Sequence, residues 1–188
     1  MKKRRIFAAI NLPEYIKKRI LNWQEEWTSL PVRWTKKQSL HITLVFIGYA
    51  GDEEMLEVCQ TAKETGRRHQ PFEIELKRIC FGPPGRSPRI IWLEGEENLA
   101  LAELKDDFEG HLLDSNQSGY NRKEVRAFRP HITLARIRQR EWRLMPSKPN
   151  IEKEVSLSFL VESIEVMESR LLRDGAEYVV LESTPLGG

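Results

Sequence analysis

The chain has 188 residues, of which 40% are apolar and 31% are charged, and this size and balance suit a single globular domain in water. Its 30 basic and 28 acidic residues leave a formal net charge of +2, which excludes a uniformly polycationic surface. The sequence contains no run of about 18 apolar residues, and the apolar run behind its basic start is too short for a secretory signal, so we expect neither a membrane span nor export. Cys59 and Cys80 are too few for a disulfide framework, which favours the cytoplasm.

The hydrophobic pattern predicts strands and helices mixed along the chain without strict alternation. Residues 4–10 are typical of a strand, and Asn11 opens a helix that reaches about residue 30. Three prolines and two glycines predict a loop over residues 81–88. The remaining predicted elements are helices over residues 52–68 and 98–113 and strands over residues 41–47, 72–79, 89–93, 131–137, 156–169 and 177–181. This mixture favours an α+β fold with a largely antiparallel sheet.

One tetrapeptide, HITL, occurs twice, beginning at His41 and again at His131. The two copies are separated by about half the chain, and together they hold two of its four histidines. Chance recurrence of this tetrapeptide in a chain of this composition is on the order of one in a thousand. Each copy follows a predicted helix and begins a predicted strand, so we expect two pseudo-equivalent lobes.

Each copy presents a histidine and a threonine to the same side of its strand. Side chains alternate along a strand, so His41 and Thr43 point one way, about 6.6 Å apart. A pseudo-twofold relation would bring His131 and Thr133 to the same cleft. Two imidazoles with pKa values of about 6.5 can hold opposite protonation states, so that one accepts a proton and the other donates one. With threonine hydroxyls donating to phosphate oxygens, this set predicts metal-free phosphodiester cleavage, and the motifs alone leave open which histidine is the acid.

The paired motifs resemble the two-histidine phosphoesterase superfamily. Within it, the chain is similar to the RNA 2′,3′-cyclic phosphodiesterases, also called 2′-5′ RNA ligases. The similarity covers nearly the whole sequence, in the stretches RIFAAINLP, LHITLVFIGYA, PRIIWLEG, FRPHITLAR and SRLLRDGAEYVVLESTPL.

The resemblance implies a fold and a reaction. The fold is a bilobal α+β pseudo-twofold duplication, with two mainly antiparallel sheets, helices packed outside and a central cleft, and residues 1–188 form one phosphoesterase domain of two interleaved lobes. The reaction is hydrolysis of RNA 2′,3′-cyclic phosphate ends to 2′-phosphomonoesters without a metal or other cofactor, and some members also ligate RNA reversibly through 2′-5′ linkages. His41 and His131 then become the acid–base pair, and Thr43 and Thr133 the phosphate clamp. The partner is RNA that carries a cyclic phosphate or a 2′-5′ linkage, and we expect a monomer because one chain holds both motifs.

The second motif lies in a basic segment. Residues 119–143 hold eight basic and two acidic residues, a net charge of +6, whereas residues 144–188 hold four basic and eight acidic residues, a net charge of −4. Arg129 and Arg136 flank the motif, and an arginine fork suits phosphate oxygens, although a solvated surface position is the alternative for each.

Several aromatic side chains are candidates for stacking on RNA bases. Tyr120 and Phe128 lie in or near the basic segment and are the better candidates. Phe46 and Trp92 also suit stacking, but Phe46 has the strand parity of Ile42, which predicts that it packs in the core.

Other functions fit the sequence less well. A zinc hydrolase needs three or four ligands at recognised spacings, and the chain has no HExxH or CxxC motif, so we expect no metal site. A nucleophile elbow is likewise missing from the sequence. A non-catalytic RNA-binding module that uses the same cleft is the remaining alternative, but binding alone does not require two titratable imidazoles. His69 and His111 end predicted helices, where we expect a structural role.

Overall fold

The computed structural model describes residues 3–85, 87–115, 120, 128–172 and 175–188, and the structural statements below concern these residues. The elements in chain order are β1 (Arg4–Asn11), α1 (Glu14–Glu26), β2 (Val32–Trp34), a 3₁₀ helix (Lys37–Ser39), β3 (His41–Ala50), α2 (Asp52–Arg68), β4 (Phe72–Gly82), β5 (Ile90–Gly95), α3 (Leu99–Asp114), β6 (His131–Ile137), α4 (Gln139–Leu144), β7 (Lys153–Val161), β8 (Ser163–Leu172) and β9 (Gly175–Pro185). None of these helices has the length and apolar character needed to cross a membrane.

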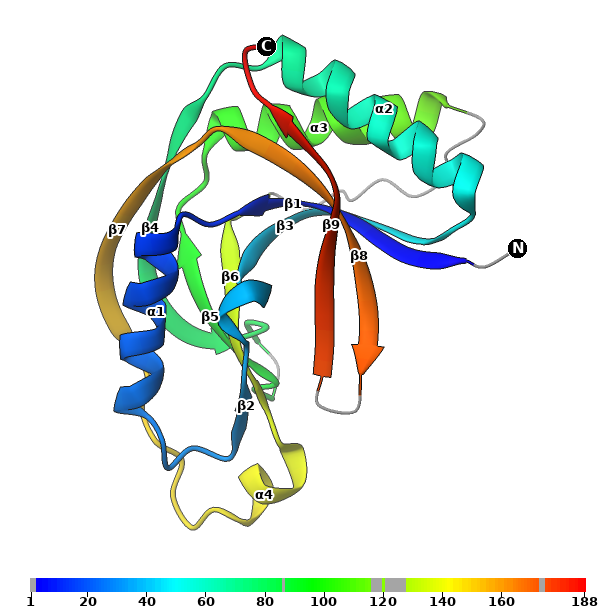
Figure 1. Ribbon diagram of the computed structural model, residues 1–188. Coiled ribbons are helices and arrows are strands. Elements are labelled where there is room, and N and C mark those ends of the chain that lie inside the picture. The colour runs from blue at the N-terminus through cyan, green and yellow to red at the C-terminus, as the bar shows by residue number, and fades with distance from the viewer. Residues whose placement is uncertain (1–2, 86, 116–119, 121–127, 173–174) are drawn as a thin grey trace.

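The strands form one curved antiparallel sheet in the order β7-β4-β5-β6-β3-β1-β8-β9, and β2 pairs with β6 (Figure 1). The α+β class and the antiparallel pairing are confirmed. The two predicted sheets are two halves of this one sheet, because β3 and β6 pair at a single position, Ile42 with Ile132. Helices α2 and α3 lie together at one end of the molecule, and α1 lies beside β7 (Figure 1).

The strand order repeats on the two sides of this joint. Outward from it, one half runs β3-β1-β8-β9 and the other runs β6-β5-β4-β7. In each half, a strand and a helix precede the strand that begins with HITL: β1 and α1 precede β3, and β5 and α3 precede β6. Both HITL strands therefore lie at the centre of the sheet, next to each other.

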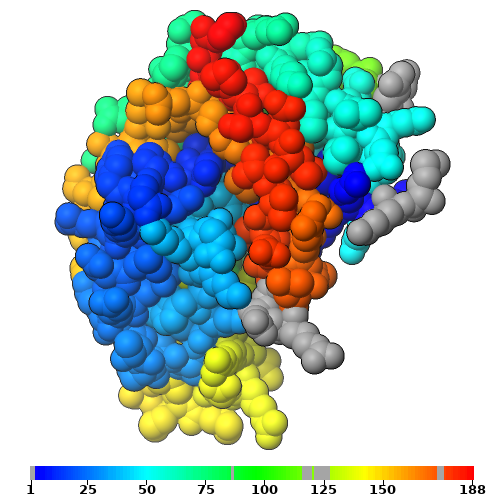
Figure 2. Space-filling view, viewed as in Figure 1, coloured from blue at the N-terminus to red at the C-terminus, as the bar shows by residue number. Residues whose placement is uncertain are grey.

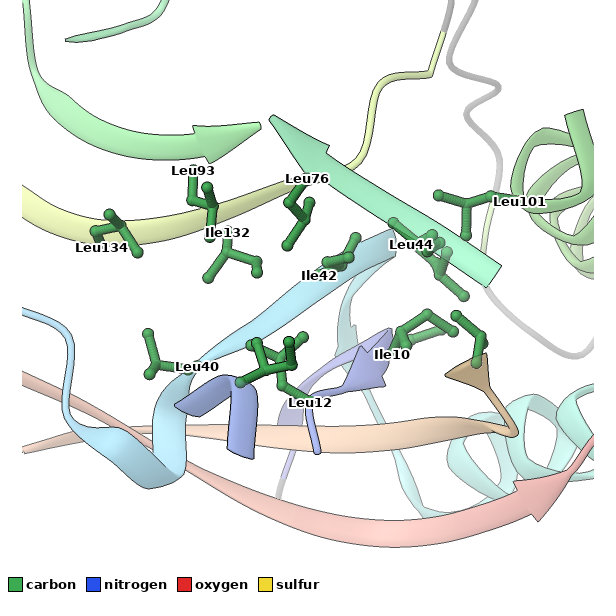
Figure 3. Close-up of a cluster of buried hydrophobic side chains, with 14 of the residues drawn as sticks. Ile10, Leu12, Leu40, Ile42, Leu44, Leu76, Leu93, Leu101, Ile132 and Leu134 are labelled. Carbon is green, nitrogen blue, oxygen red and sulfur yellow. The ribbon is translucent and has the colours of Figure 1, made fainter. Parts of the chain in front are cut away.

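The main hydrophobic core of the described residues runs beneath both halves. The apolar residues of the two motifs, Ile42, Leu44, Ile132 and Leu134, are all almost completely buried. They pack in one cluster with side chains from neighbouring strands and from α3 (Figure 3). Because these positions point into the core, the alternating histidines and threonines point to the other face of the sheet.

The helix boundaries have simple local causes. In α2, three acidic residues occupy the first turn and two arginines the last, an arrangement that complements the helix dipole. In α3, the side chain of Asn98 accepts a hydrogen bond from the backbone N–H of Leu101 at 2.9 Å, as an N-cap does. The predicted helix over residues 52–68 is confirmed, whereas α1 ends at Glu26, earlier than predicted.

Two other features of the chain differ from the sequence-based expectation. The predicted strand over residues 156–169 is wrong as a single element. This segment forms two strands separated only by Glu162: β7 pairs with β4 in one half of the sheet, and β8 pairs with β1 in the other half. The short elements β2 and α4 were not predicted, because three to six residues give too little periodicity to recognise.

Candidate active site

The four polar side chains of the two motifs meet at the central joint of the sheet. Continuing the antiparallel register outward from Ile42 and Ile132 places His41 beside Thr133 and Thr43 beside His131. All four side chains line one cavity of about 910 Å³. The structure therefore brings the predicted acid–base pair and the predicted phosphate clamp to one place.

Both imidazoles are held by the same local hydrogen bond. The Nδ1–H of His41 donates to the carbonyl oxygen of Ser39 at 2.8 Å, and the Nδ1–H of His131 donates to the carbonyl oxygen of Arg129 at 3.0 Å. In each motif the acceptor lies two residues before the histidine. This bond fixes the tautomer of a neutral ring, so Nε2 carries the lone pair that faces the cleft. In the first motif Nε2 accepts a hydrogen bond from the Thr43 hydroxyl at 3.1 Å.

The surroundings of the two rings differ. The His41 ring packs between Phe7, at a centroid distance of 5.0 Å, and the edge of Tyr178 on β9, at 4.9 Å. In Figure 2, β9 (red) lies against the light-blue segment that leads into β3, so it closes this side of the site. Among the described residues, the His131 ring has one aromatic neighbour, Trp92, at a centroid distance of 4.6 Å.

This packing changes the acidity of His41. Burial lowers its pKa from 6.5 to about 4, because the charged imidazolium loses its hydration. The Ser39 carbonyl partly opposes this shift, and the nearby charge of His131 adds to it. His41 is therefore neutral at physiological pH and can accept a proton.

The cleft is positively charged. Arg5, Arg33 and Arg136 line it, whereas no aspartate or glutamate within the described part of the chain does so. The contrast is notable because acidic residues are almost as numerous as basic ones in this chain. A wall with arginines and without carboxylates suits a polyanion such as RNA.

A β-bulge shifts the alternation after Thr43 in β3. Ala9 pairs with Thr43 but Ala8 pairs with Val45, so one extra residue stands between the two pairs. Leu44 and Val45 are consequently both buried, and Phe46 turns to the cleft with 66% of its surface exposed. The expectation that Phe46 packs in the core is wrong, because it assumed an unbroken pleat.

The second motif contains an equivalent bulge. Trp92 pairs with Thr133 but Ile91 pairs with Ala135, so Leu134 and Ala135 are both buried and Arg136 turns to the cleft. Phe46 and Arg136 are thus equivalent positions, each five residues after its histidine. The cleft therefore has an aromatic side chain at one of these two equivalent positions and an arginine at the other.

Of the two arginines singled out from the sequence, only Arg136 lines the cleft. Arg129 is not among the lining residues, and its guanidinium pairs with the exposed carboxylate of Glu97 at 3.2 Å. The backbone carbonyl of Arg129, rather than its side chain, takes part in the site through His131.

The two aromatic candidates from the basic segment lie in different surroundings. Tyr120 lines the cleft, and its hydroxyl donates to the carboxylate of Glu109. Phe128 packs against the hydrophobic core, where the ammonium of Lys105 lies 5.7 Å from its ring centroid. The rest of the basic loop around Tyr120, residues 116–119 and 121–127, lies outside the described residues.

Sequence reasoning missed Arg5 and Arg33 as residues of the cleft. Arg5 belongs to a basic run that reads as a solvated surface, and Arg33 lies on a three-residue strand with no recognisable period. Only their place beside the motif strands in the folded sheet identifies them.

The remaining histidines lie elsewhere, as expected. His69 and His111 both contact Asp107, which joins the end of α2 to α3. In the described ranges, no group of three or more histidine, cysteine, aspartate or glutamate side chains is arranged to hold a metal ion.

Comparison with known proteins identifies relatives of this chain. The family model for LigT-like phosphoesterases matches residues 10–92, which include the first motif. The chain is 29% identical over 181 residues to the RNA 2′,3′-cyclic phosphodiesterase of Methanocaldococcus jannaschii, covering 95% of this chain and 98% of the relative. It is 30% identical over 159 residues to the enzyme of the same name from Aeropyrum pernix, covering 82% and 86%. A crystal structure of a Thermus thermophilus protein superposes with a TM-score of 0.84 over 98% of both chains at 24% identity, which shows the same fold.

Proposed function

The chain belongs to the RNA 2′,3′-cyclic phosphodiesterase family of LigT-like phosphoesterases, and we propose that it hydrolyses RNA 2′,3′-cyclic phosphate ends to 2′-phosphomonoesters. The observation that carries the proposal is the meeting of His41, Thr43, His131 and Thr133 on one face of the sheet. Two imidazoles and two hydroxyls around one point suit a reacting phosphate.

The surroundings of the histidines support a division of roles. His41 is neutral because of its burial, so it accepts the proton of the attacking water as the water oxygen bonds to phosphorus. His131 then donates a proton to the ribose O3′ as the bond between phosphorus and O3′ breaks. The product carries a 2′-phosphate and a free 3′-hydroxyl, and one water molecule is consumed.

The threonines act on the phosphate itself. When the phosphate binds, the Thr43 hydroxyl turns from His41 Nε2 to one non-bridging oxygen and the Thr133 hydroxyl donates to the other, where negative charge increases in the transition state. The arginine-lined cleft adds a favourable field without a metal ion, and we propose that no metal or other cofactor takes part.

The same chemistry supports ligation. When the 5′-hydroxyl of a second RNA replaces water as the nucleophile, the product is a 2′-5′ phosphodiester and the same proton transfers apply.

The ends of the cleft suit different parts of the RNA. Phe46 offers an exposed ring that can stack on a base, and Tyr120 lines the same cavity. Arg136, at the position equivalent to Phe46, suits a phosphate instead.

The proposed unit of function is one chain. We propose that residues 1–188 form a single domain of two interleaved lobes, which the mirrored strand order supports. A monomer suffices because both motifs come from the same chain, and two buried free cysteines are compatible with the cytoplasm.

The decisive experiment identifies the product. The purified protein is incubated with a chelator and an oligonucleotide that ends in a 2′,3′-cyclic phosphate, and the phosphate isomer is determined. We expect the 2′-phosphate. A 3′-phosphate would contradict the mechanism, and tight binding without any product would favour the non-catalytic RNA-binding alternative.

A further inference from the structure

Helix α3 buries an ion pair that the proposed mechanism does not use. Lys105 Nζ lies 2.9 Å from Glu109 Oε2, and the two side chains are only 2% and 1% exposed. Taking two charges out of water is costly, and apolar side chains of similar volume often give equal or greater stability. Elsewhere α3 packs on the core through apolar residues such as Leu101 and Phe108. Stability alone therefore gives little reason for this pair.

The pair contacts a residue of the cleft. The hydroxyl of Tyr120 donates a hydrogen bond to Glu109 Oε1, while Glu109 Oε2 accepts one from Lys105. Tyr120 lines the same cavity as His41 and His131. Because its hydroxyl donates to the buried carboxylate, Tyr120 offers its ring rather than its hydroxyl to a ligand in the cleft.

Lys105 also contacts the segment that leads into the second motif. Its ammonium lies 5.7 Å from the ring centroid of Phe128, which packs against the core. Phe128 directly precedes Arg129, whose carbonyl oxygen accepts the hydrogen bond from His131 Nδ1. The buried pair thus contacts two described residues, Tyr120 and Phe128, of the segment between α3 and β6.

The first half of the sheet contains a parallel arrangement. Gln24 is buried on α1, the helix before the first motif, and its side-chain N–H donates to the carbonyl oxygen of Thr35 at 3.2 Å. Thr35, like Tyr120, lines the cleft and lies between its helix and its HITL strand. In both halves, a buried polar side chain of the preceding helix therefore holds a residue of the cleft wall. This recurrence favours a role for the ion pair in the site.

We propose that Lys105 and Glu109 are positioning residues that hold the Tyr120 ring in the wall of the cleft, where the ring contacts the bound nucleotide. The inference rests on the proposed function and adds the pair to the residues on which substrate binding depends. Lys105 fixes the Glu109 carboxylate, and a hydrogen bond to an ionised carboxylate is roughly twice as strong as a neutral one.

The test separates the Tyr120 hydroxyl from the buried pair. kcat and KM are measured with an oligonucleotide that ends in a 2′,3′-cyclic phosphate, for Tyr120→Phe, for Lys105→Met/Glu109→Leu and for the triple variant that combines them. The first two should each raise KM about tenfold at nearly unchanged kcat, as for a lost charge-assisted hydrogen bond that serves binding alone. The triple variant should show no further increase, because both changes break the same contact.

The design distinguishes positioning from a purely structural role. A variant that folds poorly contains less active enzyme, which lowers the apparent kcat and leaves KM unchanged, whereas misplacement of the Tyr120 ring raises KM. Tyr15→Phe is the matched control, because it removes a tyrosine hydroxyl that donates to the carbonyl oxygen of Ser158 at 3.1 Å, outside the cleft. Its KM should equal that of the wild type.

The outcomes separate the positioning role from the proposed function. An unchanged KM in Tyr120→Phe, a lower kcat with unchanged KM in Lys105→Met/Glu109→Leu, or additive increases in the triple variant would each overturn the positioning role and leave the hydrolase activity standing. If the wild type turns over no cyclic phosphate, the proposed function fails, and the positioning role with it.

Discussion

Ile42 and Ile132 pair directly with each other at the centre of the sheet, and each is the second residue of an HITL motif. When equivalent residues of a repeat pair with themselves in an antiparallel ladder, an approximate twofold axis passes between them. The histidines and threonines on either side of these isoleucines are then related by that axis. The repeated tetrapeptide therefore places two histidines and two threonines around one point.

The first prediction concerns both histidines. His41→Ala and His131→Ala should each lower turnover of a 2′,3′-cyclic phosphate by roughly 10²–10⁴-fold, because each removes one proton transfer. Steady-state rates with chelator present give the measurement. His69→Ala is the control, since His69 contacts Asp107 outside the cleft and should leave the rate near that of the wild type. Activity within tenfold of wild type in both cleft variants would refute the acid–base assignment.

The second prediction concerns the pH dependence of kcat/KM. His41 acts as the base in its neutral form and has a pKa of about 4, so the rate should stay high from pH 6.5 to pH 5 and fall only as pH approaches 4. The two rings influence each other, so the acidic limb reports an apparent value of the pair. An acidic limb near pH 6.5 would show that His41 is not the base, provided that circular dichroism confirms a folded protein throughout.

The third prediction follows from the same pKa and concerns stability. Between pH 6.5 and pH 4, His41 binds a proton in the unfolded chain but not in the folded protein, so lowering the pH favours unfolding. The free energy of unfolding should fall by up to about 3 kcal/mol across this window on account of His41, at 1.36 kcal/mol per pKa unit. Urea titrations at several pH values compare the wild type with His41→Asn, in which this contribution is absent while all other groups still titrate. Parallel curves for the two proteins would contradict the burial of His41.

How far the sequence predicts this site depends on unbroken local patterns. HITL alone indicates that Ile42 and Ile132 point into a core while the histidines and threonines point away from it, because alternation holds over these four residues. Alternation fails immediately after the motif, between Leu44 and Val45, where a bulge turns Phe46 to the cleft. A bulge depends on how two strands pair, so no pattern within one strand reveals it.

In the fold as well, local patterns predict some features, whereas others depend on how distant strands pair. The helix over residues 52–68 was predictable because its period, its acidic first turn and its basic last turn agree. Arg33 was not, because its role depends on the pairing of β2 with β6, which joins segments about a hundred residues apart.

The fourth prediction concerns the exposed ring of Phe46. Phe46→Ala should weaken binding of an RNA substrate by about 1–3 kcal/mol, the usual contribution of an aromatic side chain stacked on a base. Its stability should change by no more than about 0.5 kcal/mol, because the side chain is 66% exposed. Tyr49→Ala is a close control, since Tyr49 lies on the same strand with 67% exposure but does not line the cleft. Equal effects of the two substitutions on KM would argue against stacking by Phe46.

The fifth prediction concerns the buried ion pair of Lys105 and Glu109 in α3. Lys105 Nζ and Glu109 Oε2 are 2.9 Å apart, and the two side chains are only 2% and 1% exposed. Lys105→Met removes a charged partner of Glu109 in a low-dielectric interior, so it should lower the free energy of unfolding by about 3–5 kcal/mol. The double variant Lys105→Met/Glu109→Leu should recover most of that loss, because it removes both desolvated charges and keeps the volume.

Urea unfolding of the single and double variants provides the measurement, and the exposed pair of Arg138 and Glu141 provides the comparison. Arg138→Ala should change the free energy of unfolding by less than about 1 kcal/mol, because water screens that pair. Glu109 also accepts a hydrogen bond from Tyr120, a residue of the cleft, so the double variant should recover stability more fully than it recovers RNA affinity. If the single and double variants lose the same stability, the pair is not coupled in the way that its burial implies.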